Sequence, residues 1–116
     1  MDIKIIKKPI SKGKLKKIAK KQFGDLVKAV VDVSKEIMAI GGELHSDEEI
    51  FLIEKERSKH KNLWGINIYP KKTGKDFIEF DSMINLKPAF GNRSRNVESR
   101  ETKEKIRKII KKLISE

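Results

Sequence analysis

The sequence predicts a single α+β domain, in which a mostly antiparallel sheet of about five strands carries helices on one face. Three observations predict this class. The chain has 116 residues, which is the size of one domain. Segments with strand-like and helix-like hydrophobic patterns follow one another in the order β-α-β-β-α-β-β-α. The connections between neighbouring strands are short, which favours antiparallel pairing.

The first strand and helix are indicated by the opening residues of the chain. The segment DIKIIKK alternates and is rich in isoleucine, so we expect a strand over residues 2–7 that ends before Pro9. Ser11 has the position of an N-cap for a helix over residues 12–23, and Gly24 follows as a stop. The exposed face of this helix is almost entirely lysine.

The middle of the chain contains a hairpin followed by an ambiguous segment. We expect strands over about 26–33 and 36–41, both ended by turn or glycine signals. The next segment, SDEEIFLIEKERS, contains the apolar run of a buried strand, but Ser46 and Glu49 also match a capping box. Because its acidic residues complement the positive end of a helix dipole, we expect a helix over residues 47–57.

The last third of the chain predicts two strands, a loop and a helix. NLWGINIYP indicates a strand over 63–69, and FIEFDSMINL indicates a strand over about 77–87, bent near its middle. Ser99 can cap the C-terminal helix. The apolar stripe of this helix should belong to the core, and it consists of Ile106, Ile109, Ile110, Leu113 and Ile114.

Several classes of protein do not fit the composition. The chain has no cysteine, which excludes disulfides, thiolate catalysis and cysteine-bound zinc. No apolar run approaches the roughly 18 residues of a membrane span, and the N-terminus does not resemble a secretory signal, so we expect a cytoplasmic protein without a membrane partner. No phosphate-binding, dinucleotide-binding or nucleophile-elbow motif is present, and we expect no cofactor.

The net charge of +11 favours attraction to nucleic acid or another anionic surface. A simpler explanation is compositional bias, because 23 of the 28 basic residues are lysine. The charge is unevenly distributed: residues 1–22 carry nine lysines and one acid, whereas residues 43–56 carry six acids and one lysine. The two regions could meet in the fold or lie on different faces.

The segment GNRSR is the strongest candidate for a binding site. It places Arg93 and Arg95 in a glycine-flanked loop of a chain with only five arginines. Guanidinium groups match the oxygens of phosphate and carboxylate, and loop N–H groups can add an anion-binding concavity. We therefore expect an anion to contact Asn92, Arg93, Ser94, Arg95 and Asn85, together with Lys16, Lys17 and Lys20 of the first helix. The alternative is that the arginines pair with Glu79, Asp81 or the acidic helix.

Three weaker candidates have ordinary structural explanations. Glu79 and Asp81 would share one face of a straight strand and could act as acid and base, or they could line a solvated surface. The segment GGELHSDEE offers carboxylates near His45, but it has no metal-binding spacing, and we expect no metal site. Trp64 and Tyr69 could stack bases, although a single tryptophan at the start of a strand is usually part of the core.

Five segments resemble a family of small prokaryotic proteins known only as a domain of unknown function. They are QFGDLVKAVVDV, AIGGELHSDEE, LWGINIYP, IEFDSMIN and GNRSRNV, and they cover most of the chain. The resemblance implies one self-contained cytoplasmic domain over residues 1–116. It supplies no activity, and it assigns no role to any residue.

Three functions are compatible with these features. The favoured one is an anion-binding module that contacts RNA or DNA phosphates through the lysine-rich helix and the loop from Gly91 to Arg95. The second is a binder of a small phosphate or carboxylate, or an enzyme acting on one, that uses Asp81 or Glu79 with the two arginines. The third is a structural or partner-binding protein in which the arginines serve only the fold. The sequence does not determine whether the protein is an enzyme or what oligomer it forms.

Overall fold

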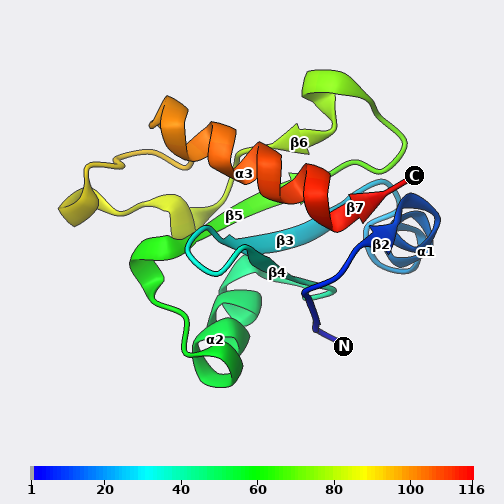
Figure 1. The fold of residues 1–116 in the computed structure, drawn as a ribbon, viewed down its shortest axis with the longest axis horizontal. Coiled ribbons are helices and arrows are strands. Elements are labelled where there is room, and N and C mark those ends of the chain that lie inside the picture. Colours follow the sequence, from blue (N-terminus) through cyan, green and yellow to red (C-terminus); the bar gives the residue numbers. More distant parts are fainter. Residues whose placement is uncertain (1) are drawn as a thin grey trace.

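The computed structural model describes residues 2–116, which form a five-stranded sheet with helices on both sides (Figure 1). The strand order is β1-β4-β3-β5-β6, and every pairing in this sheet is antiparallel. The strands are β1 (Lys4–Ile6), β4 (Ile37–Ile40), β3 (Val27–Asp32), β5 (Leu63–Ile68) and β6 (Ile78–Glu79). A separate two-stranded parallel sheet pairs β2 (Ile10–Ser11), close to the start of the chain, with β7 (Ile114–Ser115), at its C-terminal end. The predicted α+β class and antiparallel sheet are therefore confirmed.

Three α-helices and four short 3₁₀ helices complete the fold. The α-helices are α1 (Lys12–Gln22), α2 (His45–Glu56) and α3 (Arg100–Leu113). The 3₁₀ helices are η1 (His60–Asn62), η2 (Gly74–Asp76), η3 (Met83–Asn85) and η4 (Pro88–Phe90). No helix of residues 2–116 has the length and apolar character needed to cross a membrane.

The ends of α1 and α3 are capped as the sequence predicts. The Ser11 hydroxyl accepts a hydrogen bond from the N–H of Lys14, and the Ser99 hydroxyl accepts one from the N–H of Thr102. Each bond satisfies a backbone donor that a helix leaves open at its first turn. Gly24 follows α1 with a φ of 91°, a conformation that glycine adopts without strain.

The start of α2 differs from the prediction. The helix begins two residues early, at His45, and Leu44 occupies the N-cap position without a side-chain hydrogen bond. Ser46 therefore lies inside the helix, and the expected capping box with Glu49 does not form. The helix itself is confirmed, because Leu52 and the other inward residues of α2 pack on the sheet.

The helices do not share one face of the sheet, and this part of the prediction is wrong. Alternate strand residues, including Ala29, Val31 and Ile66, form one core with α1 and α3. The intervening residues, including Val30 and Leu63, form a second core with α2. Because successive side chains of a strand point to opposite faces, α3 and α2 lie on opposite sides of the sheet (Figure 1). The three central strands, β4, β3 and β5, are buried on both faces, and their residues are accordingly almost continuously apolar.

The predicted strand over residues 77–87 is also shorter than expected, because β6 ends at Glu79. The chain then turns away, and Ser82 caps η3 by accepting a hydrogen bond from the N–H of Ile84. The side chain of Asn85 replaces the missing strand. Its Oδ1 accepts from the N–H of Gly65 at 2.8 Å, and its Nδ2 donates to the carbonyl oxygen of Gly65 at 3.0 Å. The amide of Asn85 thus makes the two hydrogen bonds to Gly65 that the backbone of a neighbouring strand would otherwise make.

Candidate functional site

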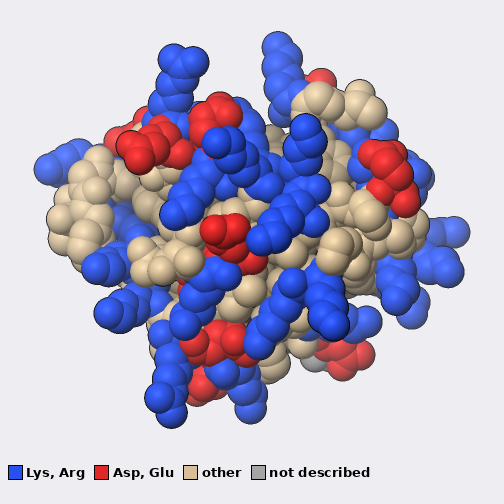
Figure 2. All heavy atoms as spheres, in the orientation of Figure 1, with Lys and Arg blue, Asp and Glu red and all other residues tan. Residues whose placement is uncertain are grey.

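Charge is distributed unequally between the two sides of the sheet. On one side, α1 carries six lysines and no acidic residue, and α3 carries seven basic and two acidic residues. On the other side, α2 carries five acidic residues and one lysine. Figure 2 shows Lys and Arg spread over the face that carries α3, with smaller acidic groups between them. The basic helices α1 and α3 and the acidic helix α2 therefore lie on different faces of the sheet, and the basic and acidic regions of the sequence meet where Lys7 pairs with Glu56 at 2.9 Å.

The two asparagines predicted to bind an anion are buried and already bonded to the backbone. Besides its two bonds to Gly65, Asn85 donates to the carbonyl oxygen of Arg95 at 2.9 Å. Asn92 donates to the carbonyl oxygens of Asn85, Ser94 and Asn96. It also accepts from the N–H of Glu98 at 2.8 Å. In this conformation both side-chain amides are bonded to the backbone and hold the loop together.

The other three loop residues are at the surface in part or in full. The Nε of Arg95 lies 2.6 Å from Oδ1 of Asp81, so this guanidinium pairs with a carboxylate of the protein itself. Arg93 is exposed and contributes its backbone N–H to Glu98, while the hydroxyl of Ser94 accepts from the N–H of Asn96. This geometry matches the structural alternative for Arg95 and leaves the guanidinium of Arg93 at the surface.

Glu79 and Asp81, the possible acid and base, are both engaged in pairs. Glu79 accepts hydrogen bonds from Nδ2 of Asn67 at 2.8 Å and from the Tyr69 hydroxyl at 3.2 Å. Burial and the neighbouring Glu79 carboxylate raise the pKa of Tyr69 above its usual value. Residues 2–116 contain no group of three or more His, Asp or Glu side chains arranged to hold a metal ion.

His45 and Glu48 are on the side of α2 that packs against the sheet. The Nε2 of His45 is 2.8 Å from the carbonyl oxygen of Ile66, which can only accept, so Nε2 carries the hydrogen. Burial lowers the pKa of His45, although this hydrogen bond opposes the shift. Burial raises the pKa of Glu48 well above its usual value, while the N–H of Gly42 and the charge of Lys28 oppose that shift. In both cases burial favours the neutral form, and both side chains pack between α2 and the sheet.

Lys87 is a buried lysine on the same segment as the predicted loop. Its ammonium donates to the carbonyl oxygen of Ile84 at 2.7 Å and lies 4.7 Å from the centroid of the Trp64 ring. Burial lowers the pKa of Lys87 to about 8, and the charge of Glu49 opposes the shift. With an exposed fraction of 2%, this lysine cannot reach a ligand in solution.

The lysines predicted to contact phosphate lie on α1, away from the loop. Lys16, Lys17 and Lys20 are exposed, and Figure 1 places α1 and the loop around η4 at opposite ends of the molecule. The helix α3 runs between these ends (Figure 1). Contact with both regions would therefore require a ligand long enough to follow α3.

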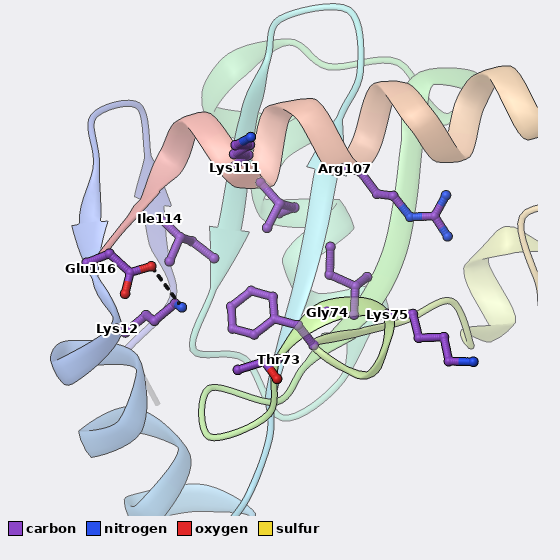
Figure 3. Close-up of a pocket in the computed structure, with 11 residues that line it drawn as sticks. Lys12, Thr73, Gly74, Lys75, Arg107, Lys111, Ile114 and Glu116 are labelled. Atoms are coloured by element: carbon purple, nitrogen blue, oxygen red, sulfur yellow. Dashed lines mark hydrogen bonds and ion pairs between the residues drawn. The ribbon is translucent and has the colours of Figure 1, made fainter.

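A groove at the C-terminal end of α3 is the candidate site with the most apolar lining on the basic side. Its volume is about 430 Å³, and it lies between α3, the loop around η2 and the β2–β7 pair (Figure 3). Its apolar lining consists of Phe77, Ile78, Ile110 and Ile114. Its basic lining consists of Lys12, Lys75, Arg107 and Lys111. The groove therefore combines an apolar floor with a cationic rim.

The two ends of this groove differ in charge. At one end, Nζ of Lys12 pairs with the carboxylate of Glu116 at 3.1 Å. At the other end, Lys75 and Arg107 extend from the η2 loop and from α3 respectively (Figure 3). Lys75 has no ion pair within residues 2–116. Arg107 pairs with Glu104 on its own helix at 2.7 Å, and both side chains of that pair are about half exposed. The Lys75 end is thus the part of the groove that an anion can approach.

Comparison with known proteins gives a family without an assigned activity. Residues 4–113 match the family described as Protein of unknown function (DUF5674). The chain belongs to this family. No curated protein and no solved structure matches the chain. The resemblance found in the sequence is therefore confirmed, and the functional argument depends on the geometry described above.

Sequence reasoning missed the groove for a topological reason. Arg107 and Lys111 stand four residues apart on α3, a spacing that is visible in the sequence. Lys12, Lys75 and Phe77 come from distant segments, and only the docking of α3 beside the η2 loop brings them together. No local motif signals this arrangement.

Proposed function

We propose that this protein is an anion-binding module that contacts nucleic-acid phosphates through the side of the sheet formed by α1 and α3. One observation carries the proposal: both basic helices lie on one side of the sheet, and three of their cations, Lys12, Arg107 and Lys111, line one groove. A concentrated basic surface attracts phosphate chains and releases their counterions. The cytoplasmic location expected from the sequence is compatible with this role and stays a prediction.

A nucleic acid fits this surface better than a lipid membrane does. Membrane-surface helices present large apolar side chains beside their basic residues. The apolar stripe of α3 is instead buried in the core, at Ile106, Ile109, Ile110 and Leu113. Among residues 2–116, the strongly exposed large apolar side chains lie on α2, on the η3–η4 segment and at the ends of these elements, apart from Phe23 after α1. The basic side therefore offers charge without a lipid-binding stripe.

The test is fluorescence anisotropy with a labelled 15-nucleotide DNA strand at several salt concentrations. For a single strand, the slope of log K against log salt is about −0.7 per phosphate contact. We expect the Arg107→Ala/Lys111→Ala variant to bind more weakly and to reduce this slope by about 1.4, because two such contacts are lost.

The matched control is Lys59→Ala/Lys61→Ala, which removes the same charge near the C-terminal end of α2. This variant should change the slope much less, and both variants should keep the melting temperature of the wild type. If the two variants lost the same affinity for the DNA strand, binding would depend on net charge alone. No binding by the wild type at low salt would refute the proposed function.

A further inference from the structure

We propose that the groove beside α3 receives one unpaired nucleobase, so that the module selects single-stranded over double-stranded nucleic acid. This inference rests on the proposed function and names its ligand. The observation behind it is that the groove is more apolar than a phosphate site needs to be. Its floor contains an aromatic ring and three isoleucines, whereas its cations stand at the rim.

The volume and lining of the groove suit a flat ring with a phosphate attached. Sites for small organic ligands have volumes of roughly 300–1,000 Å³ and combine mostly apolar walls with a few polar groups. The groove has about 430 Å³ and carries Thr73 and Gly74 on the loop that faces α3 (Figure 3). A base could pack against the Phe77 ring while Lys75 and Arg107 hold the adjoining phosphate.

The Phe77 ring is covered by an exchangeable cation. Nζ of Lys12 lies 5.3 Å from the ring centroid. The partner of this lysine, Glu116, has a side chain that is 92% exposed, and exposed pairs of this kind contribute little free energy. A base that stacks on Phe77 can therefore displace the ammonium group. Base–aromatic stacking is favourable for every base, so we expect little sequence preference.

A duplex cannot make the same contact, because its bases are paired inside the helix and only its phosphates face the protein. The basic surface would hold both forms through phosphate contacts, and the groove would add affinity for the single strand alone. Selectivity for a single strand is thus the property that separates this inference from the proposed function.

The experiment compares three 15-unit ligands at the same salt concentration: a DNA strand, its duplex, and a strand of abasic units that keeps the phosphates. We expect the normal strand to bind at least about fivefold more tightly than the abasic strand. Phe77→Leu should remove most of this difference and leave abasic binding unchanged. Phe51→Leu is the matched control, because this ring lies on α2 and also has a lysine, Lys55, over it.

Methyl NMR of the wild type tests the groove without relying on a variant that has to fold. Stacked bases should shift the methyl signals of Ile110 and Ile114, which line the groove, and leave those of Ile50 and Ile53 on α2 in place. Equal binding of normal and abasic strands, with no shift at Ile110 and Ile114, would overturn the inference while leaving phosphate binding intact. An affinity of the wild type for AMP equal to its affinity for the 15-unit strand would also overturn the inference. The neighbouring phosphates would then add nothing to the affinity for the strand.

Discussion

The side of the sheet under α3 is filled with aliphatic side chains, whereas the side under α2 contains most of the buried polar groups. Ile106, Ile109 and Ile110 of α3 pack on alternate strand residues. On this side His45 and Glu48 of α2 are buried together with Asn67, Ser82 and Asn85, and each is less than 9% exposed. The polar groups of the α2 side are engaged with the fold itself, and the cations of the α3 side remain at the surface. The comparison shows that a polar motif that contains arginine can have a structural role, whereas the lysine-rich helices carry the charges that a ligand can reach.

The largest expected effect comes from removing the side-chain amide that completes the edge of β5. Asn85→Ala would leave the N–H and carbonyl groups of Gly65 and the carbonyl group of Arg95 without their partner. Because each unpaired buried group costs about 1–3 kcal/mol, we expect the free energy of unfolding to fall by roughly 3 kcal/mol or more. Urea denaturation measures this change.

The control for this variant is Asn62→Ala, since that half-buried amide has no side-chain hydrogen bond within residues 2–116. Its effect should stay below about 1 kcal/mol. A loss of stability by Asn85→Ala no larger than that of the control would contradict the structural role of the α2 side. Where the Asn85 variant remains folded, it should bind the DNA strand as the wild type does.

The second largest expected effect is a loss of stability at the place where η3 packs closely against β5. A Cβ on Gly65 would lie 2.5 Å from both Cβ and Oγ of Ser82 and 3.1 Å from Cγ of His45. We expect Gly65→Ala to destabilise the protein by about 1–3 kcal/mol, because the packed neighbours have to move. Thermal and urea unfolding measure the loss.

Gly13→Ala provides the opposite case on the α3 side of the sheet. Gly13 lies in the first turn of α1. A Cβ added there would have Oγ of Ser11 as its nearest neighbour, at 3.8 Å. Alanine has the higher helix propensity by up to about 1 kcal/mol, so this variant should be at least as stable as the wild type. Equal effects of the two glycine substitutions would show that the tight packing between Gly65 and Ser82 is not a constraint in solution.

The buried acid Glu48 predicts a pH dependence that belongs to the α2 side alone. Its pKa is raised in the folded state, so above about pH 4.5 the unfolded chain releases a proton that the folded chain keeps. The contribution of Glu48 to the free energy of unfolding is therefore fully present below pH 4.5. It is lost as the pH rises toward the pKa of Glu48 in the folded protein. Glu48→Gln imitates the protonated acid and should remove the loss.

We expect Glu48→Gln to be more stable than the wild type at pH 7.5 and similar to it near pH 4.5, as measured by urea unfolding at both values. Glu54→Gln is the control, because that carboxylate of α2 is exposed and should leave the pH dependence in place. A Gln variant that is less stable than the wild type at pH 7.5 would indicate that Glu48 is ionised in the folded protein.

The smallest effect is expected for the arginine that first suggested a binding site. The Arg95–Asp81 pair is about half exposed on both sides, and such pairs contribute roughly 0–1 kcal/mol. Arg95→Ala should therefore lower the free energy of unfolding by less than about 1 kcal/mol, and Arg93→Ala by less. Anisotropy titrations of the same variants test the remaining part of the original prediction. A loss of DNA binding larger than that of Arg107→Ala/Lys111→Ala would move the site to this loop.

The sequence by itself determined the class of fold, the position of all three α-helices and the main strand order along the chain. These features depend on local patterns: the period-two strands, the serine caps of α1 and α3, and the apolar stripe of α3. The resemblance to a family of unknown function, stated from the sequence, is confirmed by the match over residues 4–113. Such signals need only neighbours within a few residues of one another.

Tertiary structure alone decided which face each helix covers, where β6 ends and which polar residues are exposed. The strands are apolar on both faces, so their pattern could not assign α2 to one side. The sequence predicts Asn85 in a strand and Asn92 in a loop. In the structure both side chains are buried, because Asn85 bonds to Gly65 of β5 and Asn92 bonds to the backbone of its own segment. The groove joins Lys12, Lys75 and Arg107 across almost the whole chain. These features depend on contacts between distant residues, which a single sequence does not encode in any local pattern.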